Sequence, residues 1–428
     1  MKVLLLADDC NPDWPSLPVV GYKSARALAD EVELTVATHV RNRPAIEREG
    51  FGRATVVYID NEYIARPMHR FSTLLRGGTS VGWSTNVAMA YLPYLAFERE
   101  VWKTFRHELE AGIFDLVHRL TPMSPTLPSL MAKKSPVPFV VGPLNGGLRW
   151  PLEFQYLRRR EREWMTYVRR LHQWLPYYRS TYRRSACILT AFKHTKQDVP
   201  TCCTERCIDF PEVGVDPGLF HHDSNVEKPG TPMTMLFVGR LVPYKCADIA
   251  IQAFSRSAAL KRHRLKIIGD GPEEHRLRSL VDHHRLHGCV EFLGSKSQQE
   301  VGRIMREEAN VFVFPSIREL GAGVVVEAMA SGLACVGVDY GAPGTLLGNG
   351  RGIAVSLGNR EELITRYVRE LESLVNAPER IQKLGNEARK FAMDQLTWSA
   401  KARKFTEVYR WVTGETPEKP RFWPPGEY

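Results

Sequence analysis

The sequence predicts an α/β protein with two Rossmann-like, doubly wound domains that face a cleft. Short apolar runs of strand length recur along the chain, and segments with helical spacing of apolar residues separate them. Strands that alternate with helices form parallel sheets with right-handed crossovers. Because this alternation occurs in each half of the chain, we expect two domains of this kind.

The candidate strands divide into two sets, with turn residues between them. Those of the first half are Val3–Ala7, Glu33–Thr38, Val56–Ile59, Leu116–His118, Phe139–Gly142 and Cys187–Thr190. Those of the second half are Met235–Val238, Leu265–Ile268, Val290–Leu293, Val311–Phe314 and Ala334–Val338. Between the sets, Asp216-Pro217-Gly218 and Pro229–Pro232 supply turn chemistry. We therefore expect domains at 1–215 and 216–395, followed by a segment at 396–428 that ends in a proline-rich tail.

The composition is that of a soluble globular protein, with 428 residues, 43% of them hydrophobic and 25% charged. No apolar run reaches about 18 residues, and the first run stops at Asp8, so we expect neither a membrane-spanning helix nor a signal peptide. The cysteines are too sparse for a disulfide framework, and Cys202, Cys203 and Cys207 lack a fourth metal ligand at a recognised spacing. We expect a cytoplasmic protein with free thiols and no metal.

The positive charge is concentrated in one stretch. The net charge is +10, and residues 149–184 contain ten arginines, three glutamates and nine aromatic residues. Two interpretations stay open. The stretch is either an amphipathic helical pair whose arginines face water, or a surface for an anionic membrane or a lipid-linked diphosphate acceptor at the inner face of that membrane. Nucleic acid is not expected as a partner, because no recognised binding module accompanies the charge.

Segment 314–332 carries the clearest signal for chemistry. A strand ends at its first residue, a loop with Glu319 follows, and a helix that begins near Ala322 or Gly323 carries Glu327. In a parallel sheet, ligands bind outside the carboxyl ends of the strands, and the first N–H groups of a helix suit a phosphate. Carboxylates accept hydrogen bonds from sugar hydroxyls. A nucleotide sugar matches these features, since its phosphates lie between a ribose and a hexose.

Two cations follow another strand of the same sheet. Arg240 and Lys245 come directly after Met235–Val238, where they could hold a diphosphate and stabilise its charge as it leaves. The dinucleotide fingerprint Gly-x-Gly-x-x-Gly is absent after the first strand, where Gly21 is the single glycine of the loop. A nicotinamide-dependent dehydrogenase is therefore disfavoured.

These segments together resemble the family 4 glycosyltransferases of the GT-B fold. The matching residues cover most of 233–340 in the family's order, and they are Gly239-Arg240-Leu241 with Lys245, Gly269-Asp270-Gly271-Pro272, Phe292-Leu293-Gly294, and Glu319 and Glu327 followed by Ala328-Met329-Ala330. Asp115–His118 and Pro143–Gly147 are similar to first-half segments of some members. Trp398–Trp411 resembles the closing helix that crosses back onto the first domain. Cys246 departs from the family, where glycine usually follows the lysine.

The resemblance implies retaining transfer from a nucleoside diphosphate sugar to a hydroxyl of a glycan or lipid-linked acceptor, without a metal or another cofactor. It implies that Glu319 contacts the donor sugar, Glu327 the ribose, and Arg240 and Lys245 the diphosphate. His118, at the end of a predicted strand, is a further catalytic candidate. The other donor-binding candidates are Gly21, Gly239, Gly269, Gly271, Gly321, Ala322, Gly323, Val324 and Lys296.

Two other functions stay open. A glycosidase would hydrolyse glycosides without a nucleotide, with an acid and a second carboxylate across a water-filled site. A non-catalytic binder of nucleotide sugars or glycans could use the same fold, although Glu319, Arg240, Lys245 and Glu327 are all present. Product formation, as opposed to donor binding alone, distinguishes an enzyme from a binder.

Overall fold

The computed structural model describes residues 1–428 except 69–89, 161–170, 224–229 and 424–428. The chain forms two compact units. Unit 1 contains Met1–Gly147, Glu161–Glu212 and Trp398–Pro424, and unit 2 contains Leu148–Arg160, Val213–Thr397 and Pro425–Tyr428. We predicted domain boundaries after residues 215 and 395, and the chain passes from one unit to the other after residues 212 and 397. Residues 148–160, which we expected in the first domain, pack with unit 2 instead.

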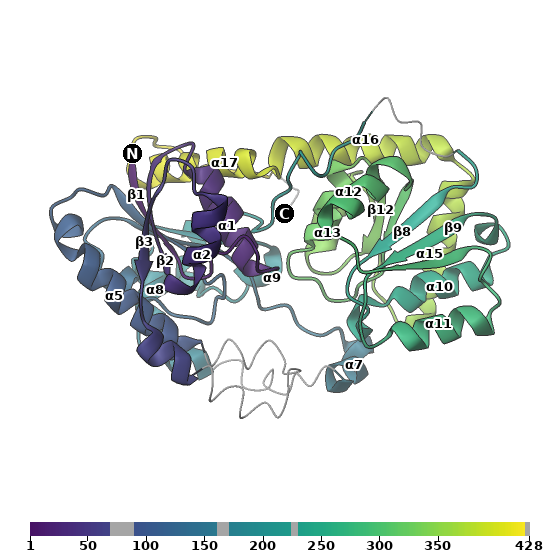
Figure 1. Cartoon of the computed structure of the whole chain (residues 1–428), viewed down its shortest axis with the longest axis horizontal. Helices are drawn as coiled ribbons and strands as arrows, with labels where there is room; N and C mark the ends of the chain where they lie inside the picture. Colours follow the sequence, from purple (N-terminus) through teal and green to yellow (C-terminus); the bar gives the residue numbers. More distant parts are fainter. Residues whose placement is uncertain (69–89, 161–170, 224–229, 424–428) are drawn as a thin grey trace. The chain divides into compact units, whose positions relative to one another are not determined.

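Unit 1 is built on a parallel sheet, which has seven strands in the described part of the chain, in the order β3-β2-β1-β4-β5-β6-β7 (Figure 1). The strands are β1 (Lys2–Ala7), β2 (Glu33–His39), β3 (Thr55–Ile59), β4 (Leu116–Thr121), β5 (Phe139–Leu144), β6 (Cys187–Thr190) and β7 (Cys207–Asp209). The helices are α1 (Leu17–Leu28), α2 (Arg43–Glu49), α5 (Tyr91–Glu110), α6 (Met131–Lys134), α8 (Tyr178–Arg184), α9 (Lys193–Lys196) and α17 (Trp398–Val412). Because neighbouring strands are parallel, all of them end at one edge of the sheet, which we call its carboxyl edge.

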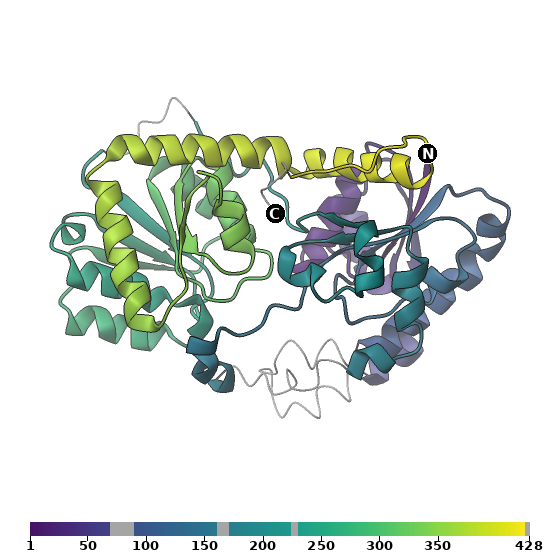
Figure 2. The same ribbon diagram turned by 180° about the vertical axis from the view of Figure 1, so that it is seen from behind.

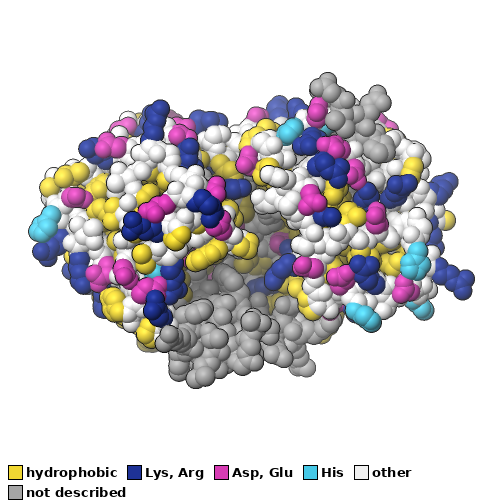
Figure 3. Space-filling view, viewed as in Figure 1, with side chains coloured by type: hydrophobic (Ala, Val, Ile, Leu, Met, Phe, Trp, Pro, Cys, Tyr) yellow, Lys and Arg dark blue, Asp and Glu magenta, His cyan; other side chains and the backbone are white. Residues whose placement is uncertain are grey.

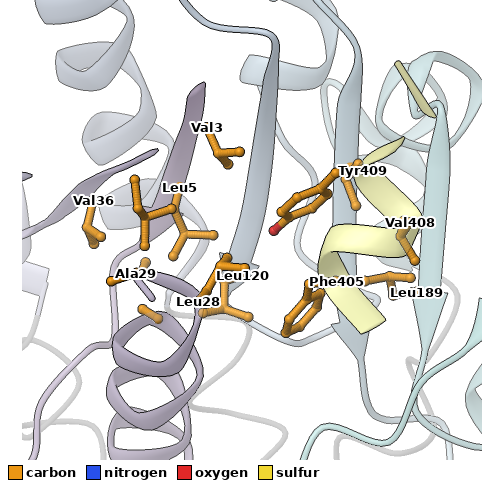
Figure 4. Packing of buried hydrophobic residues seen from close by; sticks show 14 of the residues in the cluster. Val3, Leu5, Leu28, Ala29, Val36, Leu120, Leu189, Phe405, Val408 and Tyr409 are labelled. Atoms are coloured by element: carbon orange, nitrogen blue, oxygen red, sulfur yellow. The ribbon is translucent and has the colours of Figure 1, made fainter. Parts of the chain in front are cut away.

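Strand β1 shows why its sequence is apolar from Val3 to Ala7. Leu4 and Leu6 belong to a core with helices α5, α6 and α8, whereas Val3 and Leu5 belong to a core with α1, α2 and α17. Successive side chains of a strand point to opposite faces, so a strand that is covered on both faces has no polar positions. Figure 4 shows Val3 and Leu5 in one cluster with Tyr409 of α17.

His118 of β4 joins the sheet to α17. Its side chain is fully buried, and both ring nitrogens lie 2.6 Å from a partner. The Gly142 carbonyl can only accept, so Nε2 donates to it and Nδ1 accepts from the Tyr409 hydroxyl. Burial lowers the pKa of His118 to about 4. Since α17 also packs against α1, the closing helix returns to unit 1, as the sequence predicted.

Unit 2 is built on a second parallel sheet, with six strands in the described residues, in the order β10-β9-β8-β11-β12-β13. The strands are β8 (Thr234–Val238), β9 (Arg264–Ile268), β10 (Val290–Gly294), β11 (Val311–Phe314), β12 (Ala334–Val338) and β13 (Ile353–Val355). The helices are α7 (Gln155–Arg160), α10 (Ala247–Arg256), α11 (Glu274–His283), α12 (Gln298–Glu307), α13 (Gly323–Ala330), α14 (Ala342–Leu347), α15 (Arg360–Val375) and α16 (Pro378–Gln395).

The helices of unit 2 cover both faces of this sheet. Helices α10 and α11 pack together on one face, and α12, α13 and α16 lie on the other (Figure 1). Helix α16 runs along α13 and β12, as Figure 2 shows from behind. The sheet is therefore buried like that of unit 1, and its carboxyl edge is left for loops.

The predicted fold class is confirmed, because each unit is a parallel sheet between helices. Each of the predicted strands coincides with an observed one. The sequence did not predict β7 and β13, which have three residues each and lie at sheet edges, too short for a recognisable pattern. Among the described helices, none has both the length and the apolar character needed to span a bilayer.

The buried His118 predicts a pH dependence of stability. Its pKa falls from an ordinary 6.5 to about 4 on folding. The neutral imidazole therefore makes its full contribution to the free energy of unfolding above pH 6.5, and this contribution is lost as the pH drops towards 4. We expect a loss of up to about 3 kcal/mol over this range. In His118→Gln, which cannot titrate, the free energy of unfolding from denaturant titrations should fall less over the same pH range. Parallel curves for the two proteins would contradict this assignment.

Candidate active site

The loops after β8 and β11 meet at the carboxyl edge of the unit-2 sheet. β8 and β11 are neighbours, so loops 239–245 and 315–322 begin side by side. The carbonyl oxygen of Tyr244 accepts a hydrogen bond from the Ile317 N–H at 3.0 Å, and the Ser316 hydroxyl oxygen lies 3.2 Å from the same carbonyl. The bond from Ile317 fixes the loops to each other.

This junction brings a cation and a carboxylate into contact. Lys245 Nζ lies 2.5 Å from Glu319 Oε1, and the two side chains are only 13% and 11% exposed. The Ser316 hydroxyl donates to the same carboxylate oxygen at 2.6 Å, and the Lys245 ammonium lies 4.8 Å from the centre of the Phe314 ring. Charges with so little access to water need partners. The pair can therefore offer one cation and one acceptor to a ligand that takes over both contacts.

Helix α13 begins at this junction and leaves backbone donors free of helical partners. Ala322 has a left-handed conformation, with φ 53°, and its carbonyl accepts from the N–H groups of Val325 and Val326. The N–H groups of Gly323 and Val324 precede the first helical hydrogen bond, so the helix has no acceptor for them. Such donors at a helix start bind anions favourably.

The structure brings most of the predicted donor-binding residues together in unit 2. The side chain of Arg240 is exposed in the β8 loop. Gly321 lies two residues before α13, and Glu327 lies on that helix. Lys296 follows β10 at the same edge of the sheet, where its Nζ lies 3.6 Å from Glu300. Their roles in binding stay predictions.

Gly269 and Gly271 let the loop after β9 approach the loop after β8. At Gly271, which has φ 150°, a Cβ would lie 2.5 Å from the Leu241 carbonyl oxygen. At Gly269, which has φ 134°, a Cβ would collide with the Gly239 carbonyl. The Leu241 N–H donates to the Asp270 carbonyl at 2.6 Å across the same contact. The two glycines therefore shape the loop that carries the predicted phosphate-binding cations.

Two predicted site residues belong to unit 1. Gly21 lies in α1, where a Cβ would collide with the Asp9 carbonyl, so this glycine lets the helix approach the end of β1. His118 is fully buried and both of its ring nitrogens are hydrogen-bonded. The geometry gives His118 a packing role, and its catalytic role stays a prediction.

Three residues that shape the site were not predicted: Ser316, Tyr244 and Gly341. Gly341 follows β12 with φ 66°, where a Cβ would collide with the Glu319 carbonyl, and the Ala342 N–H donates to that carbonyl at 3.1 Å. Ser316 and Tyr244 lie within the segments that the sequence analysis described. Their contact involves the backbone carbonyl of Tyr244, and such a contact cannot be recognised from residue types. For Gly341, the available signal was a glycine directly before a helix.

Carboxyl groups also lie at the carboxyl edge of the unit-1 sheet. Asp8 and Asp9 follow β1, and burial raises the pKa of both side chains, with a further contribution from Asp9 to the pKa of Asp8. Their carbonyls accept hydrogen bonds from Asn42 Nδ2 at 2.8 Å and from the Thr121 hydroxyl at 3.2 Å. Within the described residues, no group of three His, Cys, Asp or Glu side chains could hold a metal ion.

Comparison with known proteins defines the class to which this fold belongs. Residues 221–391 match the family described as glycosyl transferases group 1. The structure of Anabaena HepE in complex with UDP has a TM-score of 0.63 at 15% identity, over 95% of this chain and 99% of that one. Sucrose-phosphate synthase from Thermosynechococcus elongatus also has a TM-score of 0.63 at 15% identity, over 97% of this chain and 100% of that one. The fold is GT-B, as the sequence predicted.

A curated relative matches a shorter part of the chain. The putative colanic acid biosynthesis glycosyltransferase WcaL of Salmonella typhimurium is 36% identical over 141 residues. These residues make up 31% of this chain and 34% of WcaL, so the chain spans about a third of that relative's length. The likeness to the solved structures extends over the whole chain, but at 15% identity it concerns the fold alone.

The contact at Gly271 predicts that two glycine-to-alanine variants differ in their free energy of unfolding. Gly271→Ala should lower the free energy of unfolding by about 1–3 kcal/mol, because its φ of 150° strains an L-residue and its Cβ meets Leu241. Gly288→Ala is the matched control, since its Cβ would have nothing within 4 Å, and it should stay within about 0.5 kcal/mol of the parent. Urea unfolding measures both, and equal losses would refute the packing role.

Proposed function

We propose that the protein is a retaining, metal-independent family 4 glycosyltransferase that uses a nucleoside diphosphate sugar in polysaccharide synthesis. The observation that carries the proposal is the contact of Lys245 with Glu319 beside the start of α13. A cation with helix N–H groups suits a diphosphate, and a carboxylate suits sugar hydroxyls. The match of 221–391 to glycosyl transferases group 1, the HepE complex with UDP, and the assignment of WcaL to colanic acid biosynthesis support it.

The proposed reaction breaks the bond between the anomeric carbon and the diphosphate oxygen, through an oxocarbenium-like transition state. Lys245 and the N–H groups of Gly323 and Val324 stabilise the charge that develops on the leaving phosphate. Glu319 holds the donor sugar and Glu327 the ribose. The acceptor hydroxyl attacks from the face that the diphosphate leaves and gives its proton to the departing phosphate, so the anomeric configuration is retained.

The two members of the central pair should fail in different ways. Lys245→Ala should weaken binding of both UDP and UDP-glucose and lower turnover by about 10²–10³, the effect of losing a preorganised charge partner. Glu319→Gln should keep its affinity for UDP, because Lys245 is then free for phosphate, and should lose the additional affinity that the sugar provides. Calorimetry with both ligands measures this difference.

Glu387→Gln is the control for these variants, since its side chain is exposed on α16 and lies outside the loops of the site. Equal losses for UDP and UDP-glucose in Glu319→Gln would refute the division of roles. A wild-type protein that cleaves glycosides without a nucleotide would instead favour the glycosidase.

We also propose that the acceptor is lipid-linked and that unit 1 binds an anionic membrane surface. The basic stretch 149–184 is divided, because 148–160 pack with unit 2, 161–170 lie outside the described residues, and 171–184 pack with unit 1. The unit-1 part contains no acidic residue and ends in the cations of α8. Charges of both signs are mixed on the face shown in Figure 3, so net charge alone does not locate this surface.

The part of unit 1 that would meet the membrane combines apolar and basic side chains. Trp174 is 86% exposed and Leu92 is 51% exposed. The Tyr91 hydroxyl donates to the Pro176 carbonyl at 3.2 Å, which brings the start of α5 to the segment of Trp174. The exposed cations on α6 and α8, which pack together, are Lys133, Lys134, Arg179, Arg183 and Arg184. Exposed aromatic and basic side chains together suit an anionic lipid interface.

A charge reversal tests this surface. Arg179→Glu with Arg183→Glu should lower affinity for vesicles of phosphatidylglycerol and phosphatidylcholine at least about tenfold, since each basic residue near such a surface contributes about 1 kcal/mol. The control is Arg369→Glu with Arg380→Glu, an exposed pair of unit 2. Sedimentation with vesicles at two salt concentrations measures both. If the two double variants bind alike, a soluble acceptor replaces the lipid-linked one.

A further inference from the structure

A short segment of the basic stretch contacts the loops of the candidate active site. The chain leaves unit 1 after Gly147, and residues 148–157, which we call the strap, pack with unit 2. The Tyr340 hydroxyl, after β12, donates to the Arg149 carbonyl at 2.8 Å. Arg318 Nη2, in the loop after β11, donates to the Leu148 carbonyl at 3.4 Å. The strap is thus attached to the loops that follow two neighbouring strands.

Trp150 extends these attachments to the loop after β8. Its ring lies edge-on to the Tyr244 ring, with centroids 6.4 Å apart and an interplanar angle of 87°. The Arg318 guanidinium lies over the indole, 5.1 Å from its centroid. Trp150 is only 8% exposed, so the ring fills the space between these two side chains. Tyr244 and Arg318 directly precede Lys245 and Glu319 in the sequence, so one indole contacts the neighbour of each member of the central pair.

The second half of the strap borders the same loop. Phe154 is fully buried, and Leu157 is 5% exposed. Tyr156 and Leu157 line a cavity of about 300 Å³ with Pro243 and Asp248, among other residues. Pro243 precedes Tyr244, so the strap borders the Lys245 loop at more than one point.

We propose that Trp150 is a positioning residue for the donor site. Through its contacts with Tyr244 and Arg318, it holds the loops of Lys245 and Glu319 in place relative to each other. The proposal rests on the proposed function, since it assumes that these loops bind the donor. Edge-to-face aromatic and cation–π contacts are directional, so an indole at this place fixes orientation as well as volume. The bond from the Ile317 N–H to the Tyr244 carbonyl remains without it, so its loss should loosen the site without abolishing it.

The test compares Trp150→Ala, Trp150→Phe and Leu152→Ala. Leu152 lies in the same strap but is 77% exposed, so its variant is the matched control. Calorimetry with UDP should show about tenfold weaker binding for Trp150→Ala, which corresponds to about 1.4 kcal/mol. Trp150→Phe keeps an aromatic ring and should recover most of this affinity. Donor hydrolysis should show a rise in KM for Trp150→Ala that exceeds the fall in kcat.

A second measurement does not depend on the proposed function. Hydrogen exchange of the Ile317 amide, which donates to the Tyr244 carbonyl, reports directly on the junction of the two loops in the ligand-free protein. It should be at least about tenfold faster in Trp150→Ala than in Leu152→Ala. Unchanged exchange and unchanged UDP affinity in Trp150→Ala would overturn the proposal, and so would a lower melting temperature as the sole effect. If the wild type binds neither UDP nor any other nucleoside diphosphate, the proposed function fails, and the exchange rate still decides whether Trp150 sets the junction.

Discussion

The contact of Lys245 with Glu319 is the constraint on which the site depends. Both side chains have lost most of their hydration, so each needs the other, and Ser316 supplies a further hydrogen bond to the carboxylate. A ligand that enters must replace both partners. A phosphate can replace Glu319 beside Lys245, and the carboxylate then keeps the Ser316 hydroxyl as its donor. In the proposed function, the hydroxyls of the donor sugar take the place of the lysine beside Glu319.

This contact is made possible by the parallel sheet of unit 2. Because β8 and β11 are parallel neighbours, their loops emerge at the same edge, and the Tyr244 carbonyl can accept from the Ile317 N–H of the facing loop. Gly271 brings in the loop of β9 from one side, and Gly341 brings in the loop of β12 from the other. Four loops thus support one ion pair, and at Gly271 and Gly341 the close approach of two backbones requires glycine.

Much of this arrangement could be predicted from the sequence. Strands buried on both faces are apolar runs, and glycine or acidic residues mark their ends, so the two sheets and the position of Glu319 and Lys245 at one edge followed directly. The environment of His118 could not be predicted in this way. We expected β4 to end at His118, but it continues to Thr121, so His118 lies within the strand, where its ring hydrogen-bonds to Tyr409 of α17. A partner 291 residues away in sequence leaves no local signal.

The basic stretch is a second case in which the local sequence does not show the tertiary packing. Counted as one segment, residues 149–184 suggest a single charged surface, but the chain divides them between the two units. In the unit-2 part, the contacts of Leu148 and Arg149 use their backbone carbonyls, and Trp150 contributes its ring. In the unit-1 part, the arginines of α8 lie on an acid-free segment and keep their charge for solvent or a partner. Residues that are adjacent in sequence therefore belong to two separately folded units, and the charge of each part has to be judged within its own unit.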